Sequence, residues 1–196
     1  MKGRIIELLT GTGRDGINEL TQHMEEMGFF ESSCSAQNHL AKDGGLAEHS
    51  LNVMECALNL NKHLEAELSE DSIIICSLLH DIGKAGQFGK PGYVPNMLKG
   101  RATKANPDPQ PVRSTAKPFE INKDLMPVDH EVRALSIIGK YIDLTEEEQQ
   151  AILWHNGLYG TFYRQIQGKE FPLYMILHFA DMWASRVIEK EGNDAI

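Results

Sequence analysis

The feature that most constrains the fold is an apolar run at residues 73–79 that leads directly into His80 and Asp81. Ser69 can cap a helix here, and because this helix would be apolar on almost every side, we expect it in the middle of the fold. A buried strand is the alternative for so short a run. In either case Asp81 ends near the interior, where an unpaired carboxylate is costly. It therefore needs a metal ion, another cation or a dense set of hydrogen-bond donors.

Helical patterns occupy most of the remaining chain. In residues 45–64 apolar side chains recur at three- and four-residue spacings, as on one face of a helix. Asp129 can cap another helix, and Thr145 with Glu148 forms a capping box. The expected helices are 4–9, 17–27, 45–64, one from 69 to about 79, 129–142, 145–155 (ending at Gly157) and one from Pro172 to the C-terminus. No stretch alternates convincingly between apolar and polar residues, so the sequence predicts an all-α fold.

Residues 84–127 are the exception to this helical pattern. They contain seven of the eight prolines, and their eight basic and three acidic side chains give the segment a net charge of +5, against −14 for the rest of the chain. Loops of this length in a compact domain are usually either functional or disordered. We therefore expect either a long ordered loop or lid that meets an anionic substrate, or a solvated insertion.

Composition excludes several classes of protein. The chain has 196 residues, the size of one large domain or two small ones, and its net charge of −9 opposes non-specific binding to nucleic acid or anionic membranes. It has no apolar stretch long enough to span a membrane and no secretory signal at the N-terminus. The three cysteines, Cys34, Cys56 and Cys76, form no paired motif. We expect reduced thiols and a cytoplasmic protein.

A set of histidine and aspartate motifs carries the chemical signal. The His80-Asp81 pair alone is equally compatible with a structural role, in which Asp81 accepts backbone amides and His80 is a core histidine. The full set is His49 in GGLAEHSLNV, His80 and Asp81 in LLHDIGK, His130 in DHEVRAL, His155 in ILWHNG and Asp181 in HFADMWAS. Over about residues 29–186, this set resembles the HD superfamily of metal-dependent phosphohydrolases.

The resemblance implies a single helical HD-type domain over residues 1–196, with a helical extension at 1–28 and the loop at 84–127 as an insertion. It also implies metal ligands. His49, His80, Asp81 and Asp181 would bind one metal, while His130 and His155 would hold a second that Asp81 bridges to the first. The chain departs from the two-metal members at one point, because His155 is followed by Asn156 where many of them have a second histidine.

Several other residues are candidates for binding substrate. Lys84 follows Asp81 by three residues and would present a point charge to a phosphate oxygen, a contact that the family makes; a bond to helix C-terminal carbonyls is the structural alternative. Arg133 could reach substrate phosphate or form a surface ion pair with its helical neighbours. His178 shares a helix face with Asp181. His39 lies where relatives often carry a histidine near the pocket mouth.

Imidazole and carboxylate ligands suit one or two iron, manganese, nickel or zinc ions. Such a metal activates water and neutralises charge on phosphoryl oxygens. The expected activity is therefore hydrolysis of a phosphomonoester or phosphodiester, with Asp81 and Lys84 as catalytic residues and a nucleotide or short oligonucleotide as substrate. A di-iron oxygenase and a non-catalytic nucleotide-binding module remain alternatives. The motif order is most similar to the HD domains attached to bacterial exoribonucleases, but their nucleic-acid-binding barrel is absent here, which favours a small substrate over a long polymer.

Overall fold

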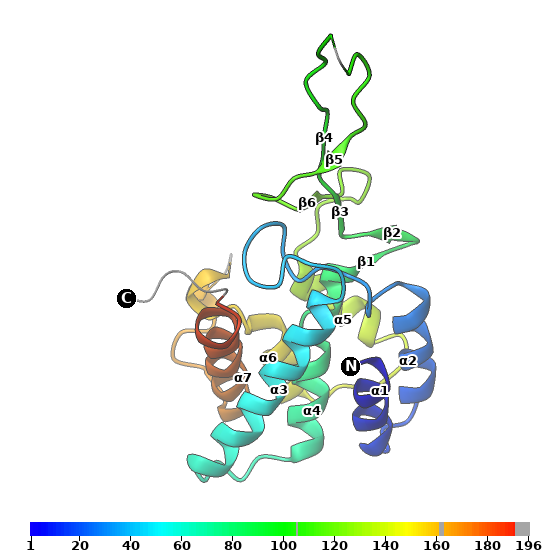
Figure 1. Cartoon of the computed structure of the whole chain (residues 1–196). Coiled ribbons are helices and arrows are strands. Elements are labelled where there is room, and N and C mark those ends of the chain that lie inside the picture. The colour runs from blue at the N-terminus through cyan, green and yellow to red at the C-terminus, as the bar shows by residue number, and fades with distance from the viewer. Residues whose placement is uncertain (105, 161–162, 191–196) are drawn as a thin grey trace.

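A computed structural model describes residues 1–104, 106–160 and 163–190. Its body is a bundle of α-helices (Figure 1), which confirms the predicted all-α fold. The helices are α1 (Lys2–Gly11), α2 (Ile17–Glu26), α3 (Gly45–His63), α4 (Glu70–Leu79), α5 (His130–Ile138), α6 (Glu146–Trp154) and α7 (Pro172–Trp183). None of these helices is long and apolar enough to cross a membrane.

Helix α4 forms the centre of the bundle, as its apolar sequence predicts. The hydroxyl of Ser69 accepts the backbone N–H of Ser72 and so caps the first turn, which excludes the alternative strand. Helices α1, α3, α6 and α7 all pack against α4. Its apolar residues from Ile73 to Leu79 are almost wholly buried, apart from the half-buried Ile74. Because α4 ends inside the bundle, the residues that follow it begin in the interior.

The N-terminal helices α1 and α2 share this core. Ile5 and Leu9 of α1, and Leu20 and Met24 of α2, are fully buried in one hydrophobic cluster with the residues of α4. Packing of α1 against α2, α3 and α4 places the first 28 residues on the side of the bundle beside α4. The predicted helical extension is therefore attached to the body by apolar contacts.

The proline-rich segment is more structured than predicted. It begins as a 3-10 helix, η1 (Ile82–Ala85), and continues in short strands: β1 (Gly86–Gln87), β2 (Lys90–Pro91), β3 (Tyr93–Pro95), β4 (Met97–Leu98), β5 (Val112–Arg113) and β6 (Phe119–Ile121). They form the antiparallel pairs β1–β2, β3–β6 and β4–β5. We call residues 93–121 the arm, because they project from one end of the bundle (Figure 1). Strands of two or three residues are too short to show an alternating pattern in the sequence.

Two helix boundaries also differ from the predictions. Helix α5 ends at Ile138, short of the expected Ile142, because the next N–H groups, those of Lys140 and Tyr141, bind carbonyls only three residues earlier. Asp129 precedes α5 without a side-chain capping bond. Helix α7 gives way at Ala184 to a π-helical segment, η4 (Ala184–Ile188). Residues 191–196, into which the last helix was expected to run, lie outside the described part of the chain.

The predicted capping box of α6 is present and is joined by an unforeseen ion pair. The backbone of Thr145 donates to Glu148, and the hydroxyl of Thr145 accepts the N–H of Glu148. The fully buried Glu148 carboxylate also binds the Arg14 guanidinium through two contacts of 2.7 and 3.0 Å. Although burial opposes ionisation, the bonds from Arg14 and Thr145 lower the pKa of Glu148. This carboxylate therefore ties the N-terminal helices to α6.

Glu148→Gln is expected to lower the free energy of unfolding by about 1–3 kcal/mol at neutral pH. The pKa of Glu148 is lower in the folded protein than in the unfolded chain, where it is about 4.3. Its ionised carboxylate therefore stabilises the fold fully above about pH 4.3, and this contribution is lost as the pH falls through the pKa of the folded state. The difference between wild type and variant should therefore shrink below about pH 4. Urea denaturation at pH 7, 5, 4 and 3 measures it. Glu147→Gln, an exposed neighbour, is the control, and a pH-independent difference would contradict the assigned cause.

Candidate metal centre

The structure brings the six predicted metal ligands together around the carboxylate of Asp81. They come from five parts of the bundle: His49 from α3, His80 and Asp81 from the end of α4, His130 from the start of α5, His155 from the end of α6 and Asp181 from α7. The side chains of His130 and Asp181 are partly exposed, and the other four are buried. Residues far apart in the sequence thus form one compact polar cluster inside an apolar bundle.

The turn after α4 sets the position of Asp81. The N–H of Lys84 donates to the carbonyl of Asp81 at 2.9 Å and closes the first turn of η1. A Cβ on Gly83 would lie 2.1 Å from the carbonyl oxygen of His130, so only glycine lets η1 pack this closely on α5. This approach leaves Asp81 Oδ1 and His130 Nε2 only 3.1 Å apart.

The two oxygens of Asp81 face different histidines. Oδ2 lies 3.5 Å from His49 Nε2 and 3.4 Å from His80 Nε2. Oδ1 lies 3.1 Å from His130 Nε2 and 3.4 Å from His155 Nε2. Asp181 completes the first group, because its Oδ1 is 3.2 Å from His49 Nε2. This division has the form expected of a carboxylate shared between two neighbouring sites.

Three polar atoms at the centre of the cluster are buried without a hydrogen-bond partner among the described residues: His49 Nε2, His80 Nε2 and Asp81 Oδ1. Buried polar atoms are nearly always paired, so orphaned nitrogen and oxygen atoms that converge on one place indicate a ligand. The potential ligand atoms of His49, His80 and Asp181 all lie within 4.8 Å of one another, as do those of His80, Asp81 and His155. The donor set therefore fits a divalent metal ion.

The other ring nitrogens of these histidines are held by the surrounding protein. Nδ1 of His80 donates to the carbonyl of Ser77 at 2.9 Å, and Nδ1 of His155 donates to that of Ile152 at 2.7 Å. Nδ1 of His49 lies 3.0 Å from each oxygen of Glu189. A histidine that donates from Nδ1 presents the Nε2 lone pair to a metal. All three rings are thus oriented as ligands.

The ionisation of the two carboxylates and of His80 suits a cation. Although burial opposes it, the positive charge of Lys84 and contact with His80 hold the pKa of Asp81 well below its usual range. His49 likewise lowers the pKa of Asp181 against the effect of burial. Burial lowers the pKa of His80, which favours the neutral form that binds metals. Two ionised carboxylates and a neutral imidazole therefore meet here at neutral pH.

Comparison with protein families matches residues 46–181 to the HD domain, a span that begins just before His49 and ends at Asp181. The chain belongs to the HD domain family. HD domains are typically metal-dependent hydrolases. Neither the curated proteins nor the solved structures contain a match to this chain. The nearer resemblance to exoribonuclease HD domains thus stays a prediction.

The second half of the HD-domain cluster differs from the first. Nε2 of His130 and Nε2 of His155 are 3.4 Å apart, and the side-chain nitrogen of Asn156 lies 3.3 Å from each of them. The same amide donates to Glu131 at 2.5 Å. Among the described residues, the closely spaced ligand groups include His155 but not His130. Asn156 therefore stands beside the second pair of histidines, where it can hold both rings.

His155→Ala is expected to reduce the metal content of this HD domain from about two ions per chain to about one, because His155 faces only the Oδ1 side of Asp81. Elemental analysis of protein purified without chelator measures it. His63→Ala, which removes an exposed histidine from α3, should leave the stoichiometry unchanged. An unchanged metal content in His155→Ala would show that this residue is not a ligand.

The structure places the two predicted phosphate-binding residues differently. Lys84 contacts Asp81 through its ammonium group at 2.5 Å, rather than helix C-terminal carbonyls, and it also lines a cavity over the cluster. Arg133 is buried, and its guanidinium donates to Gln87 Oε1 at 3.2 Å and to the carbonyl of Met126 at 2.8 Å. The predicted surface ion pair of Arg133 is therefore wrong. Its role in binding phosphate stays a prediction, and its observed contacts hold the two ends of the inserted segment.

Sequence reasoning missed Glu189. Its carboxylate is buried behind His49 and also accepts bonds from His39 Nδ1 at 2.6 Å and Asn52 Nδ2 at 2.9 Å. Although burial opposes it, the bonds from His39 and His49 lower the pKa of Glu189 to about 2. Against burial, hydrogen bonds with Cys34 and Glu189 raise the pKa of His39 to about 9. No motif marks Glu189, which lies eight residues after Asp181.

A cavity of about 410 Å³ opens over the metal ligands. Lys84 and Asp181 line it from the cluster, His39 lies near its wall, and Tyr159 and Arg186 line it as well. His178 also lines it, and its Nδ1 donates to the carbonyl of His155 at 2.7 Å. His39 and His178 are thus both brought to the site. The cavity is within the range of volumes that hold small molecules.

Proposed function

We propose that this HD domain is a metal-dependent phosphohydrolase that acts on a nucleotide or a short oligonucleotide. The observation that carries the proposal is the convergence of His49 Nε2, His80 Nε2 and Asp81 Oδ1, all buried and unpartnered, next to a cavity lined by the cation of Lys84. Nitrogen and carboxylate ligands without thiolate suit iron, manganese, nickel or zinc. One or two such ions would be held by His49, His80, Asp81 and Asp181, and by His130 and His155.

A divalent metal at these ligands supplies a Lewis acid and lowers the pKa of water towards neutrality. The residues of the chain would bind the substrate and hold the metal ligands in place. Lys84 holds an ammonium group beside Asp81 and at the cavity, where it can donate to a non-bridging phosphate oxygen. Asp181, which is ionised and lines the cavity, would be a ligand of the first metal. Backbone carbonyls and Glu189 keep Nε2 of His49, His80 and His155 directed at Asp81.

The surroundings favour a small anionic substrate. The protein is acidic as a whole, which opposes binding to long nucleic acids, whereas the cavity brings the cations of Lys84 and Arg186 together. The three cysteines are free, which fits a reducing compartment such as the cytoplasm. We therefore propose a small phosphorylated substrate in the cytoplasm.

The test is phosphate release by protein loaded separately with Fe²⁺, Mn²⁺, Ni²⁺ or Zn²⁺. p-Nitrophenyl phosphate, bis(p-nitrophenyl) phosphate, nucleoside 5′-monophosphates and a dinucleotide separate monoesterase from diesterase activity. Metal-dependent hydrolysis of any of them, abolished in Asp81→Asn, supports the proposal. Oxygen uptake that needs a reductant, without phosphate release, would instead identify a di-iron oxygenase. A nucleotide that binds but survives incubation with every metal would identify a binding module.

A further inference from the structure

The mouth of the cavity carries an exposed aromatic side chain and a cation. Tyr159, in the 3-10 helix η2 (Gly157–Tyr159), is 67% exposed although it lines the cavity. The guanidinium carbon of Arg186 lies 5.0 Å from the centroid of the Tyr159 ring. This contact orients the ring, while most of the ring surface stays open to solvent.

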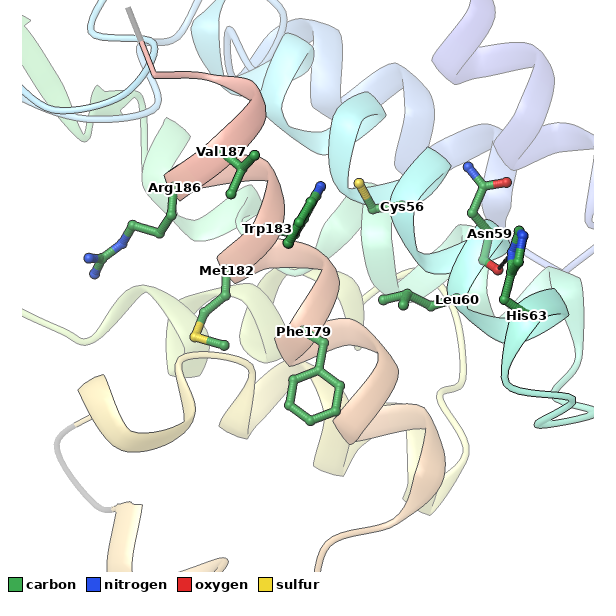
Figure 2. A pocket seen from close by; sticks show the side chains of 9 residues that line it. All are labelled: Cys56, Asn59, Leu60, His63, Phe179, Met182, Trp183, Arg186 and Val187. Atoms are coloured by element: carbon green, nitrogen blue, oxygen red, sulfur yellow. Dashed lines mark hydrogen bonds between the residues drawn. The ribbon is translucent and has the colours of Figure 1, made fainter. Parts of the chain in front are cut away.

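Arg186 lines both this cavity and an apolar groove behind it. That groove, of about 710 Å³, lies between α3 and α7, and Trp183 and Leu60 are among its lining residues. Figure 2 shows the guanidinium of Arg186 pointing away from Trp183 and from α3. The side chain therefore reaches the Tyr159 side of η4, where it adds a second cation to that of Lys84.

We propose that Tyr159 and Arg186 form a nucleobase subsite, so that the substrate is a mononucleotide with its base on Tyr159 and its phosphate at Lys84. The proposal rests on the phosphohydrolase function above and narrows its substrate class. An aromatic ring stacks on any base, and an arginine adds attraction through its planar guanidinium. A volume of about 410 Å³ suits one nucleotide better than an oligonucleotide.

The test compares a nucleoside 5′-monophosphate with ribose 5-phosphate, which lacks the base. Tyr159→Ala should lower kcat/KM for the nucleotide by about 5- to 100-fold, as expected for a lost base stack, and leave the value for ribose 5-phosphate unchanged. Tyr159→Phe should retain the preference, because the stacking surface remains. Phe88→Ala is the matched control, since Phe88 is an exposed ring with the Lys140 ammonium 5.6 Å from its centroid but does not line this cavity.

Binding of the nucleotide, measured by calorimetry on the same proteins, gives a second readout. If Tyr159→Ala loses the same activity towards the nucleotide and ribose 5-phosphate, or loses none, the subsite is overturned. Hydrolysis by the wild type would in that case still support the phosphohydrolase. If the wild type hydrolyses neither compound, the proposed function fails. In that case the binding measurements still test the subsite. Tyr159→Ala that binds the nucleotide more weakly than the wild type, but binds ribose 5-phosphate equally well, would support it. Equal binding of the nucleotide by both proteins, or no binding by the wild type, would overturn it.

A separate observation concerns the π-helical segment η4. The N–H of Glu189 donates to the carbonyl of Ala184, five residues earlier, at 2.9 Å. In an α-helix seven residues make about two turns, so Ile188 would lie in line with Asp181. The π turn adds one residue to the helical turn, so that Glu189 instead of Ile188 lies in line with Asp181. Consistent with this shift, Ile188 is 51% exposed and Glu189 is only 6% exposed.

We infer that the π turn serves to place Glu189 behind His49, and that Glu189 is a positioning residue for this metal ligand. A carboxylate behind a ligating histidine fixes the ring and raises its basicity, and its loss typically weakens metal binding 10- to 100-fold. π turns inside helices frequently occur at functional sites. Glu189→Ala should therefore weaken Co²⁺ binding by about 10- to 100-fold and change the visible Co²⁺ spectrum, whereas Glu189→Gln, which still accepts a hydrogen bond, should retain most of the affinity.

The double variant Ile188→Glu with Glu189→Ala tests the π turn itself. It should not recover Co²⁺ affinity, because residue 188 faces solvent; recovery would show that the segment adopts an α-helix, and would overturn the role of the π turn. In metal-free protein, the His49 Nδ1–H resonance should lose its hydrogen-bonded shift in Glu189→Ala. An unchanged resonance and unchanged affinity would overturn the positioning role. Failure of the wild type to bind Co²⁺ would count against the metal centre. The His49 Nδ1–H resonance would still test the hydrogen bond between His49 and Glu189.

Discussion

Asp81→Asn is expected to abolish both metal binding and hydrolysis while leaving the helical bundle folded. Asp81 is the only carboxylate among the described residues that faces all four histidines of the cluster, so its loss affects both proposed metal positions. Loss of an outer partner of a ligand typically costs 10- to 100-fold, and loss of this shared ligand should cost more, on the order of 10³-fold or greater. Elemental analysis, phosphate release and far-UV circular dichroism measure the three properties.

Asp81→Ala should give the same result, because the loss of the charged oxygens and not a change of shape is responsible. The control is Asp71→Ala, an exposed carboxylate in the first turn of the same helix, which should retain metal and activity. Activity that survives in both Asp81 variants would refute the assignment of this cluster as the active site.

Gly83→Ala is expected to cause the largest loss of stability of any single methyl group added to the site. The new Cβ would lie 2.1 Å from the carbonyl oxygen of His130 and 3.0 Å from the N–H nitrogen of Ala134, and both are backbone atoms that cannot rotate away. Overpacking costs typically 1–3 kcal/mol, and we expect about 3 kcal/mol or more here. For a chain of this length that corresponds to a fall in Tm of roughly 6–12 °C.

Gly3→Ala is the matched control, because Gly3 lies in α1 with nothing within 4 Å of its Cβ position. The same substitution there should stabilise the protein by about 0.4–1 kcal/mol, through the better helix propensity of alanine. Urea denaturation in the presence of chelator separates the effect on folding from any effect on metal binding. A Gly83→Ala protein as stable as the wild type would show that η1 and α5 can move apart.

Much of the bundle could be predicted from local signals. The Ser69 cap, the Thr145–Glu148 box and the apolar run of α4 each depend on neighbouring residues, so the sequence displays them directly. The metal ligands are different, because His49 and Asp181 are distant in the chain. Their convergence could be predicted only through the resemblance to a family, and the structure brings the six side chains together.

The features that could not be predicted depend on tertiary contacts. Arg133 looks like a surface residue in the sequence, but its partners Gln87 and Met126 lie in the inserted segment. Glu189 reaches His49 only because a π turn changes the helical register, and nothing in the sequence marks that turn. The arm escaped prediction because its strands contain only two or three residues each.

The construction of the arm has a consequence for protein engineering. Both residues of β4 and both of β5 are exposed, and such two-stranded pairs are marginally stable in water. Leu98 and Val112 are register partners, so the chain leaves and re-enters this ladder at neighbouring points. Insertions succeed at exposed loops of this kind. A small domain with adjacent termini, fused between these two residues, would be carried at a distance from the bundle, and the arm therefore offers a natural attachment point for a reporter.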